Sequence, residues 1–318
     1  MSKLQEQLLD QMFKIRRAEE KIVEVYAKEQ MMRTPTHLSI GQEAVAAGLS
    51  LALRPDDQIF TGHRCHAAYL AKGGDFNAFF AELCGRATGI SGGRAGSAHL
   101  TDPSMHVYSS PILGAMIPVA VGAAMSFKMD GKDSIAVAMF GDAVPEEGVF
   151  AESLNFALTK KLPVLFLCEN NLYSTHSPMS VRQPPSPIHE RVRTPELKTQ
   201  CIDGNDVELV YEILKKTIAE IRQTGMPQFV ECMTYRFREH VGPLFDHDRG
   251  YRSKAEVEEW MAQCPIKRFT KKLIETKSMA QTEIDALEAK WTKASDDAYA
   301  AALKAPWPSA VSLTENVY

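Results

Sequence analysis

Short, nearly continuous apolar runs alternate along the chain with longer segments whose apolar positions recur at helical spacing. Residues 134–140 and 162–168 are two such runs, as expected of strands buried on both faces of a parallel sheet. Between them, residues 147–160 carry Val149, Phe150, Leu154 and Leu158 at helical spacing. This pattern predicts a strand, a crossover helix and a second strand, which is the repeating unit of an α/β fold.

The same patterns divide the rest of the chain into few strands and many helices. We expect strands at 58–60, 134–140, 164–169, near 200–202 and at 228–236. We expect helices at 4–28, 42–51, 66–72, 76–84, 113–128, 147–160 and 206–222, and in a tail from 255 to about 302. Five strands suffice for one sheet. The predicted fold is therefore α/β, a doubly wound and mostly parallel sheet flanked by helices. It forms a single domain over 1–318, with an N-terminal helix at 4–28 and a helical C-terminal tail at 255–318.

Two segments could suggest a membrane or targeting role, and neither has the required pattern. The N-terminal helix interleaves apolar residues with charges, so it is neither a signal peptide nor an anchor. Residues 111–127 carry no charge but are at the lower length limit for a span and contain Pro118. We expect this segment to be a helix buried all round inside the core, and the protein to be cytoplasmic.

Composition narrows the function further. The chain has 318 residues, of which 45% are hydrophobic and 24% charged, which is ordinary for a globular protein. A formal net charge of -4 gives no electrostatic footprint for nucleic acid or an anionic membrane. The six cysteines are scattered without a Cys-x-x-Cys pair. They indicate reduced, mostly buried thiols, and neither a zinc site nor a disulfide framework.

The candidate chemistry lies just after the two central apolar runs. Asp142 and Ala143 follow the first run, and Asn170, Asn171 and Tyr173 follow the second. Because the carboxyl ends of parallel strands meet at one sheet edge, the Asp142 carboxylate and the Asn171 amide are expected to lie together. Magnesium prefers about six oxygen ligands, often including diphosphate oxygens. The alternative is that Asp142 is a helix cap or turn residue and the asparagines form a polar turn.

Seven ordered blocks carry a family resemblance. They are residues 36–44, 61–66, 82–86, 92–100 and 113–118, the Gly141 and Asn171 segments taken together, and 235–240. Through them, residues 16 to about 260 resemble the alpha subunit of the thiamine diphosphate-dependent first component of 2-oxo acid dehydrogenases. This is the family of the pyruvate, branched-chain and acetoin dehydrogenases. The resemblance implies a thiamine diphosphate-binding fold of the diphosphate-binding type.

The resemblance assigns residues to thiamine diphosphate and Mg²⁺. The implied metal ligands are Asp142, Asn171 and Tyr173. The implied cofactor-binding residues are His63, Arg64, Leu113, Asp142, Ala143, Val144, Asn171, Tyr173 and His240. The Arg64 guanidinium offers a planar fork of donors that suits phosphate oxygens; the alternative is a structural arginine paired with Asp56 or Asp57. Leu113 would support the bend between the two cofactor rings, or would be an ordinary core leucine.

Histidines supply the proton-handling groups, since neutral imidazole exchanges protons near pH 7. The resemblance implies two catalytic histidines: His37, which contacts the 2-oxo acid, and His240, on a mobile loop that closes over the cofactor. His66 and His99 lie in the same blocks, and for them a structural role and a functional role stay equally open.

The sequence departs from the family pattern in three places, and the departure at Ala143 concerns the fit of the cofactor. Ala143 stands where the family has glycine, so its β-carbon could intrude if the backbone needed a positive φ. Val144 follows in place of alanine, Arg94-Ala95 replaces a lysine-glycine pair, and no serine follows His240 in the 239–242 segment. With a negative φ, the Ala143 N–H could still donate to a phosphate.

The implied activity is that of an oxidoreductase, a pyruvate- or acetoin-dehydrogenase type of enzyme. A 2-oxo acid is decarboxylated, its acyl unit is held on the cofactor as an enamine, and the unit passes to an acceptor such as a lipoyl group. One alternative is a carboligase or acyltransferase in a biosynthetic pathway, and another is a degenerate cofactor-binding or scaffolding subunit.

The family mechanism also needs a glutamate from a second α/β domain, for which one sheet leaves no room. We therefore expect a beta-type partner subunit, in an α2β2 heterotetramer, and a lipoyl-bearing acyltransferase as a further partner.

Overall fold

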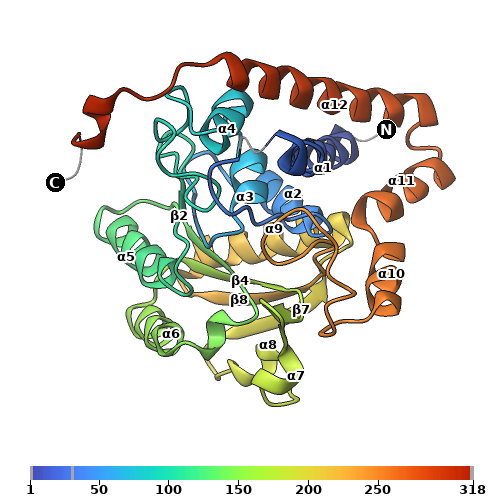
Figure 1. The fold of residues 1–318 in the computed structure, drawn as a ribbon. Helices are drawn as coiled ribbons and strands as arrows, with labels where there is room; N and C mark the ends of the chain where they lie inside the picture. The colour runs from blue at the N-terminus through green and yellow to red at the C-terminus, as the bar shows by residue number, and fades with distance from the viewer. Residues whose placement is uncertain (1–2, 30–31, 316–318) are drawn as a thin grey trace.

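The computed structural model describes residues 3–29 and 32–315. The last three positions of the predicted tail, 316–318, lie outside the described residues. The architecture is a central sheet with helices on both of its faces (Figure 1), as the apolar runs predict.

The central sheet has six strands in the order β2-β1-β3-β4-β8-β7, and every neighbouring pair is parallel. The strands are β1 (Gln58–Thr61), β2 (Val107–Ser109), β3 (Ala136–Gly141), β4 (Val164–Asn170), β7 (Lys198–Asp203) and β8 (Gln228–Met233). The two-residue strands β5 (Tyr173–Ser174) and β6 (Ser177–Pro178) form a separate antiparallel pair.

Alternate residues of the central strands enter two hydrophobic cores, one on each face of the sheet. In β3, Val137 and Met139 join the first core, whereas Ala138 and Phe140 join the second. This period of two follows from the pleat of a strand. Because both faces are covered, β4 is buried along its whole length, which explains its continuous apolar sequence.

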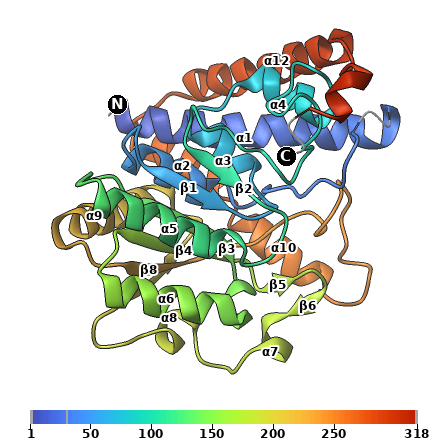
Figure 2. The ribbon, with the colours of Figure 1, turned by 90° about the vertical axis from the view of Figure 1, so that its left-hand side faces the viewer.

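Helices from distant parts of the chain cover the two faces (Figures 1 and 2). The first core includes residues of α1 (Lys3–Glu29), α2 (Glu43–Ala52), α3 (His66–Ala71), α4 (Phe76–Leu83), α9 (Val207–Thr224), α11 (Pro265–Glu275) and α12 (Gln281–Lys304), with Val257 of α10 (Lys254–Ala262). The second includes residues of α5 (Met116–Met129), α6 (Gly148–Lys160) and α8 (Ile188–Arg191). The remaining short helix, α7 (Met179–Arg182), leads away from the β5–β6 pair.

The five predicted strands are confirmed, with ends that differ by a few residues. The sequence interpretation missed β2, whose three residues Val107–Ser109 lie in a glycine- and serine-rich segment without an apolar run. It also missed α7 and α8, which interrupt the loop expected at 170–203. The predicted tail helix is broken into α10, α11 and α12, since a proline begins α11 and Ser278 and Met279 precede α12.

The prediction for residues 111–127 was wrong in one respect. This segment does contain a helix, but α5 begins at Met116 and is not buried all round. Ile117, Ala120, Val121, Ala124 and Phe127 face the second core, whereas Val119 is 48% exposed and Ile112 is 67% exposed. The chain alone therefore leaves an uncharged, apolar helix face without a cover.

Two expectations from the sequence concern membrane-spanning helices and the cysteines. Over 3–29 and 32–315, no helix combines the length and the apolar character needed to cross a membrane. All six cysteines are free and five are buried, as predicted, while Cys201 on β7 is exposed.

Candidate active site at the carboxyl edge of the sheet

The predicted site residues follow three adjacent strands at the carboxyl edge of the sheet. His63 and Arg64 follow β1, Asp142 follows β3, and Asn171 follows β4. From β1 the chain crosses first to β2 on one side and then to β3 on the other. The direction of winding therefore changes beside β1, which is where open α/β sheets bind their ligands.

A cavity opens at this edge of the sheet. All nine residues predicted to bind the cofactor line it: His63, Arg64, Leu113, Asp142, Ala143, Val144, Asn171, Tyr173 and His240. Their assignment to cofactor or metal remains a prediction, but the structure brings them together. His37 lies just outside this lining and contacts two of its histidines.

Asp142 is almost fully buried and its carboxylate accepts a hydrogen bond from the Arg182 guanidinium. Burial raises the pKa of Asp142, while Arg182 opposes the change. The Gln183 amide also donates to the Asp142 backbone carbonyl at 2.6 Å. Asp142 lies in a turn, as the alternative interpretation held, but it is not a helix cap, because Ala143 is the N-cap of the 3-10 helix that follows. The contact with Arg182 joins it to α7 across 40 positions of sequence.

The asparagines after β4 do form a polar turn, as the alternative interpretation held. Asn170 Oδ1 accepts from the Leu172 N–H at 3.0 Å, and Asn171 Oδ1 lies 3.3 Å from the Tyr173 N–H. Leu172 has a φ of 71°, so the backbone turns sharply and directs the Asn171 side chain back towards the cavity. The Tyr173 hydroxyl instead donates to Glu256 at 2.8 Å. The main chain of Tyr173, rather than its ring, can therefore face a cation.

Ala143 has a φ of -84° and a ψ of -18°, an ordinary right-handed conformation. An alanine fits this backbone without strain, so the departure from the family glycine needs no special geometry. Ala143 precedes the 3-10 helix η1 (Val144–Glu146), and both Ala143 and Val144 line the cavity.

Arg64 does not pair with Asp56 or Asp57, so the structural alternative for this residue was wrong. Its guanidinium donates to the Leu38 carbonyl, whereas Asp57 pairs with Arg222. Burial, reinforced by Arg236, lowers the pKa of Arg64 to about 10. Arg64 therefore brings a buried positive charge to the cavity wall.

Glu169 is a further ionisable group of this wall, at the end of β4. Burial raises the pKa of Glu169 to about 7, while Arg64 opposes the change. Gln42, at the same wall, accepts from the Asn171 amide at 3.3 Å, and its side-chain hydrogen bond to Glu169 also opposes the rise of the Glu169 pKa. The wall therefore offers a carboxylate that changes charge near neutral pH.

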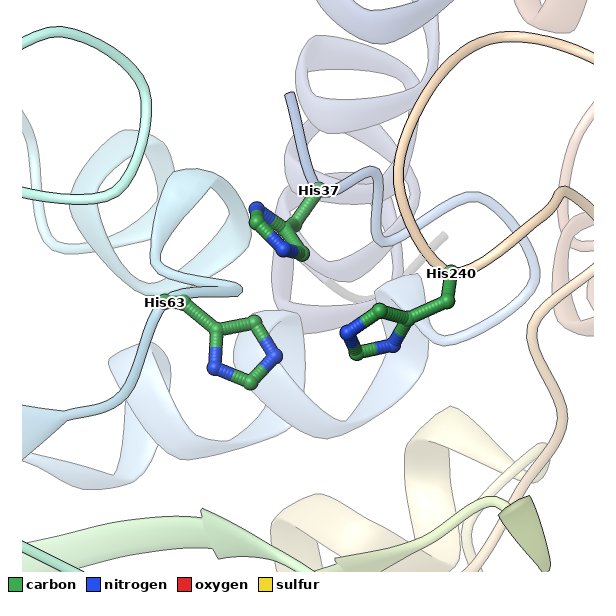
Figure 3. Close-up of side chains that lie close together, drawn as sticks. All are labelled: His37, His63 and His240. Carbon is green, nitrogen blue, oxygen red and sulfur yellow. The ribbon is translucent and has the colours of Figure 1, made fainter. Parts of the chain in front are cut away.

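Three histidine rings from three separate loops face one another beside the cavity (Figure 3). The ring centroids of His37 and His63 are 4.5 Å apart, those of His37 and His240 5.1 Å, and those of His63 and His240 5.3 Å. Burial lowers the pKa of His37 to about 2, of His63 to about 4 and of His240 to about 3, and Arg64 adds to each shift. All three imidazoles are therefore neutral at pH 7.

Backbone hydrogen bonds fix the loops that carry these histidines. The Gly242 N–H donates to the Thr36 carbonyl at 2.8 Å, and the Phe237 N–H donates to the Ile40 carbonyl at 2.9 Å. Gly41 has a φ of 103°, and a Cβ there would lie 2.3 Å from the Tyr235 carbonyl oxygen. Only glycine allows this close approach.

A buried charge cluster holds the loop that follows β8. Asp246 accepts from Arg236 at 3.0 Å and from Arg252 at 2.7 Å, and Tyr251 donates to the same carboxylate. Arg236, Arg252 and Asp246 are all buried. One carboxylate thus serves two guanidinium groups, which leaves this side of the site with excess positive charge.

His66 has a structural role, whereas His99 is exposed. The His66 ring lies 3.0 Å from Glu19 and 2.8 Å from the Ser97 hydroxyl, fully buried. Glu19 also accepts from the Ser39 N–H at 2.8 Å. His66 therefore ties the glycine-rich loop to α1 and to the segment that carries His37.

The glycine-rich loop after α4 is organised by the buried carboxylate of Glu82. It accepts backbone N–H groups at 2.7 to 3.0 Å from Ser91, Gly93, Ala95 and Gly96. The Ala95 N–H is one of these donors, so the departure from the family pattern at this position leaves the loop's hydrogen bonding intact.

The donor set at the cavity fits magnesium and a diphosphate. Asp142 offers a carboxylate, Asn171 an amide oxygen and the segment at Tyr173 a backbone carbonyl, the oxygen ligands that Mg²⁺ prefers. Arg182 already places a cation on Asp142. The buried charge of Arg64 is suited to anionic oxygens.

Sequence reasoning missed Gln42, Glu169, Arg182 and Gln183 as residues of the site. Gln42 lies in the block 36–44, and Glu169 directly precedes Asn170. Their positions at the start of a helix and the end of a strand could have indicated that they belong to the site. Arg182 and Gln183 come from a proline-rich loop with no periodicity. Their contacts with Asp142 depend on how that loop folds back.

Comparisons with known proteins agree with the motifs. Residues 10–311 match the family model described as the dehydrogenase E1 component. The alpha subunit of an acetoin:2,6-dichlorophenolindophenol oxidoreductase from Bacillus subtilis (strain 168) is 31% identical over 98% of this chain and 92% of its own length. A pyruvate dehydrogenase E1 component subunit alpha from Rickettsia bellii is 30% identical over 96% of this chain and 93% of its own. A chloroplastic counterpart from Arabidopsis thaliana is 35% identical over 89% of this chain and 67% of its own. The resemblance predicted from the seven blocks is thereby confirmed, and the chain belongs to the dehydrogenase E1 component family as an alpha-type subunit.

Proposed function

We propose that this chain is the alpha subunit of a thiamine diphosphate- and Mg²⁺-dependent enzyme that decarboxylates a 2-oxo acid and delivers its acyl unit to an acceptor. The observation that carries the proposal is the cavity at the strand ends, lined by all nine residues assigned to the cofactor. The E1 dehydrogenase family implies thiamine diphosphate, and the oxygen donors at Asp142, Asn171 and Tyr173 support magnesium.

Electrostatics favours an anionic ligand at this place. Arg64 and Arg236 are both buried, and each guanidinium carries its positive charge in a poorly solvated environment. A diphosphate held by Arg64, His63 and the Ala143 N–H would offset this charge. Mg²⁺ between Asp142 and Asn171 would in turn offset the negative charge of the diphosphate.

The bound cofactor would supply the electron sink that makes carbon dioxide a leaving group from a 2-oxo acid. The chain's own residues have different tasks. His37 and His240 are neutral imidazoles at the rim, so each can donate or accept a hydrogen bond next to the substrate. The loop at 239–242 closes one side of the cavity through the hydrogen bond between Gly242 and Thr36. Leu113 and Ile117 give the cavity an apolar wall.

The uncovered face of α5 supports a beta-type partner subunit. Val119 of α5 is an exposed apolar residue, and the exposed Ile112 and Leu113, just before α5, line the cavity. The relatives are themselves alpha subunits. We infer that a partner covers this face, supplies the missing acidic residue and forms an α2β2 assembly. The chain itself would be one cofactor-binding domain, because α1 and α12 share the core of the sheet.

The acyl acceptor distinguishes two versions of the activity. One relative is named a pyruvate dehydrogenase E1 component, and another an acetoin:2,6-dichlorophenolindophenol oxidoreductase. We propose a lipoyl group on an acyltransferase as the acceptor. Transfer to a lipoyl domain, followed by product analysis, supports this acceptor; products formed only with an added aldehyde would instead indicate a carboligase.

Calorimetry of thiamine diphosphate and Mg²⁺ with the reconstituted pair of subunits tests the proposed cofactor site. Asp142→Ala should abolish binding, whereas Asp130→Ala, which removes an exposed acid paired with Lys132, should leave it unchanged. Equal binding by Asp142→Ala and the unaltered chain would contradict the assigned site. Turnover of a 2-oxo acid by the chain alone would contradict the need for a partner.

A further inference from the structure

The three histidines that face one another form a constellation that the proposed reaction does not explain as a set. One ring nitrogen from each of His37, His63 and His240 can be chosen so that the three atoms lie within 4.8 Å of one another. In Figure 3 the three rings surround a common space. They come from the segment before α2, the turn after β1 and the loop after β8.

The ring nitrogens of these histidines can offer lone pairs to a metal ion. The Nδ1 atom of His37 is buried and has no hydrogen-bond partner in the protein. A neutral imidazole carries one lone pair on a ring nitrogen, and lone pairs that converge without donors between them are suited to a cation. Burial keeps all three rings neutral at pH 7, so no proton has to leave before a metal binds.

The loops that carry the histidines are already held in place. Gly242 donates to Thr36, next to His37 in the chain, and Arg64, next to His63, donates to Leu38. The Glu239 N–H also donates to the Leu244 carbonyl at 2.9 Å and closes the turn around His240. The segments that would supply the three ligands are therefore tied to one another without an ion.

We propose that His37, His63 and His240 together bind one zinc ion when the cofactor is absent, and that zinc and thiamine diphosphate exclude each other. Three histidine ligands with a fourth position open to water or an anion make a common zinc arrangement. Imidazole favours zinc, copper and nickel, whereas magnesium prefers the oxygen ligands of the Asp142 and Asn171 site. The two metal ions thus have separate places in one cavity.

The Arg64 guanidinium beside the rings opposes any cation there. Its charge adds to the effect of burial on all three histidines. We expect the fourth ligand to be an anion, such as hydroxide or chloride, because an anion offsets this charge. Exclusion of the cofactor follows, since His63 and His240 are both part of the wall assigned to it.

Within residues 3–29 and 32–315, a second group of side chains could also hold a metal ion and has to be compared with the three histidines. His189, Cys201 and Glu231 also bring ligand atoms within 4.8 Å of one another. Glu231, however, already accepts from His189 Nδ1 at 2.9 Å and from the Asn170 amide at 2.7 Å. A metal there would have to break these hydrogen bonds, so the histidine set is the better site.

The test uses the full chain without thiamine diphosphate, in excess Mg²⁺, titrated with ZnCl₂ by calorimetry and with CoCl₂ as a coloured substitute. We expect one ion per chain and the visible absorption of four-coordinate cobalt. His37→Gln, His63→Gln and His240→Gln should each weaken binding at least about tenfold. His99→Gln, at an exposed histidine, and Cys201→Ser should bind as the unaltered chain does.

Circular dichroism of every variant separates a lost ligand from a lost fold. Absence of zinc binding, or binding that Cys201→Ser removes and the three histidine variants keep, would overturn the proposal. Thiamine diphosphate added to the zinc-loaded chain and its partner should release the ion. Because the titration needs no cofactor and no activity, its outcome is independent of the proposed function.

Discussion

At the scale of single residues, Ala143 shows how a departure from a family pattern can be harmless. A glycine at this position suggested a backbone that only glycine adopts, and the sequence could not give the φ angle. The structure shows a φ of -84°, so the methyl group has room without strain. Alanine also restricts the unfolded chain more than glycine does.

Ala143→Gly should therefore leave cofactor binding unchanged and lower the stability slightly. We expect a loss of about 0.5–1 kcal/mol in the free energy of unfolding, from the greater freedom of glycine in the unfolded chain. Urea denaturation and calorimetric titration of thiamine diphosphate measure the two quantities. A large gain in cofactor affinity would show that the alanine methyl does obstruct the site.

A second prediction at this scale concerns Glu169 and the dependence of stability on pH. Its pKa is raised from an ordinary 4.5 to about 7 in the folded chain, so the folded state holds this proton more tightly than the unfolded state. The contribution to stability is present below pH 4.5 and is lost as the pH rises through 7. The loss amounts to up to about 3 kcal/mol.

Glu169→Gln should remove this part of the pH dependence, because glutamine does not ionise. Melting temperatures of both proteins between pH 5 and pH 8 are the measurement. The unaltered chain should lose stability against the variant over this interval. Parallel curves for the two proteins would contradict a raised pKa at Glu169.

At the scale of elements, the loop after β8 depends on charges that no local pattern reveals. Asp246 lies between Arg236 and Arg252 and is fully buried. Removing one partner of a buried ion pair leaves an uncompensated charge, which is more damaging than the pair itself is stabilising. The same loop carries His240, so its stability and the shape of the site are linked.

Asp246→Ala should destabilise the chain by about 3–5 kcal/mol, measured by urea denaturation. Asp246→Asn should be less severe, because the amide oxygen still accepts a hydrogen bond. Asp248→Ala is the matched control at an exposed neighbour and should stay close to the unaltered chain. A similar loss for Asp246→Ala and Asp248→Ala would contradict the role of the cluster.

Comparing elements with sequence shows where prediction succeeds. β3, β4 and β8 were predictable because each is a buried, largely apolar run, whereas β7 is partly exposed and carries less pattern. The residues after β1, β3 and β4 could be placed at one edge by topology alone. β2 was not predictable, since a strand of three residues carries too little hydrophobic pattern. The contact of Arg182 with Asp142 was not predictable either, because it forms only when the segment that carries Arg182 folds back onto the strand end.

At the scale of the whole molecule, the exposed face of α5 is where the isolated chain and the proposed assembly with a partner should differ. A segment without charge suggested complete burial, and within one chain that prediction was wrong. Val119 on α5 is exposed, and so is Ile112, which precedes α5 and lines the cavity. The proposed beta-type partner would cover this face and so account for the uncharged sequence.

Val119→Asp should weaken association with the beta-type partner at least about tenfold, because a charge would be buried without a partner. The melting temperature of the isolated chain should stay the same, since Val119 is half exposed there. Analytical ultracentrifugation of the mixed subunits measures the assembly. Val311→Asp, at a valine 66% exposed in the C-terminal segment, is the control; unchanged assembly for Val119→Asp would exclude α5 from the interface.

The order of the strands has a consequence for how the chain acquires its shape during synthesis. β7 pairs only with β8 in the described sheet, and β8 lies between β7 and β4 although it is made after both. Until residue 233 has left the ribosome, β4 has an open edge and β7 has no neighbour. Thr36 and Gly242 can meet only later still. The nascent chain therefore contains Asp142 and Asn171 long before it contains a binding site, and an arrested chain that stops short of β8 should be a substrate for chaperones rather than for the cofactor.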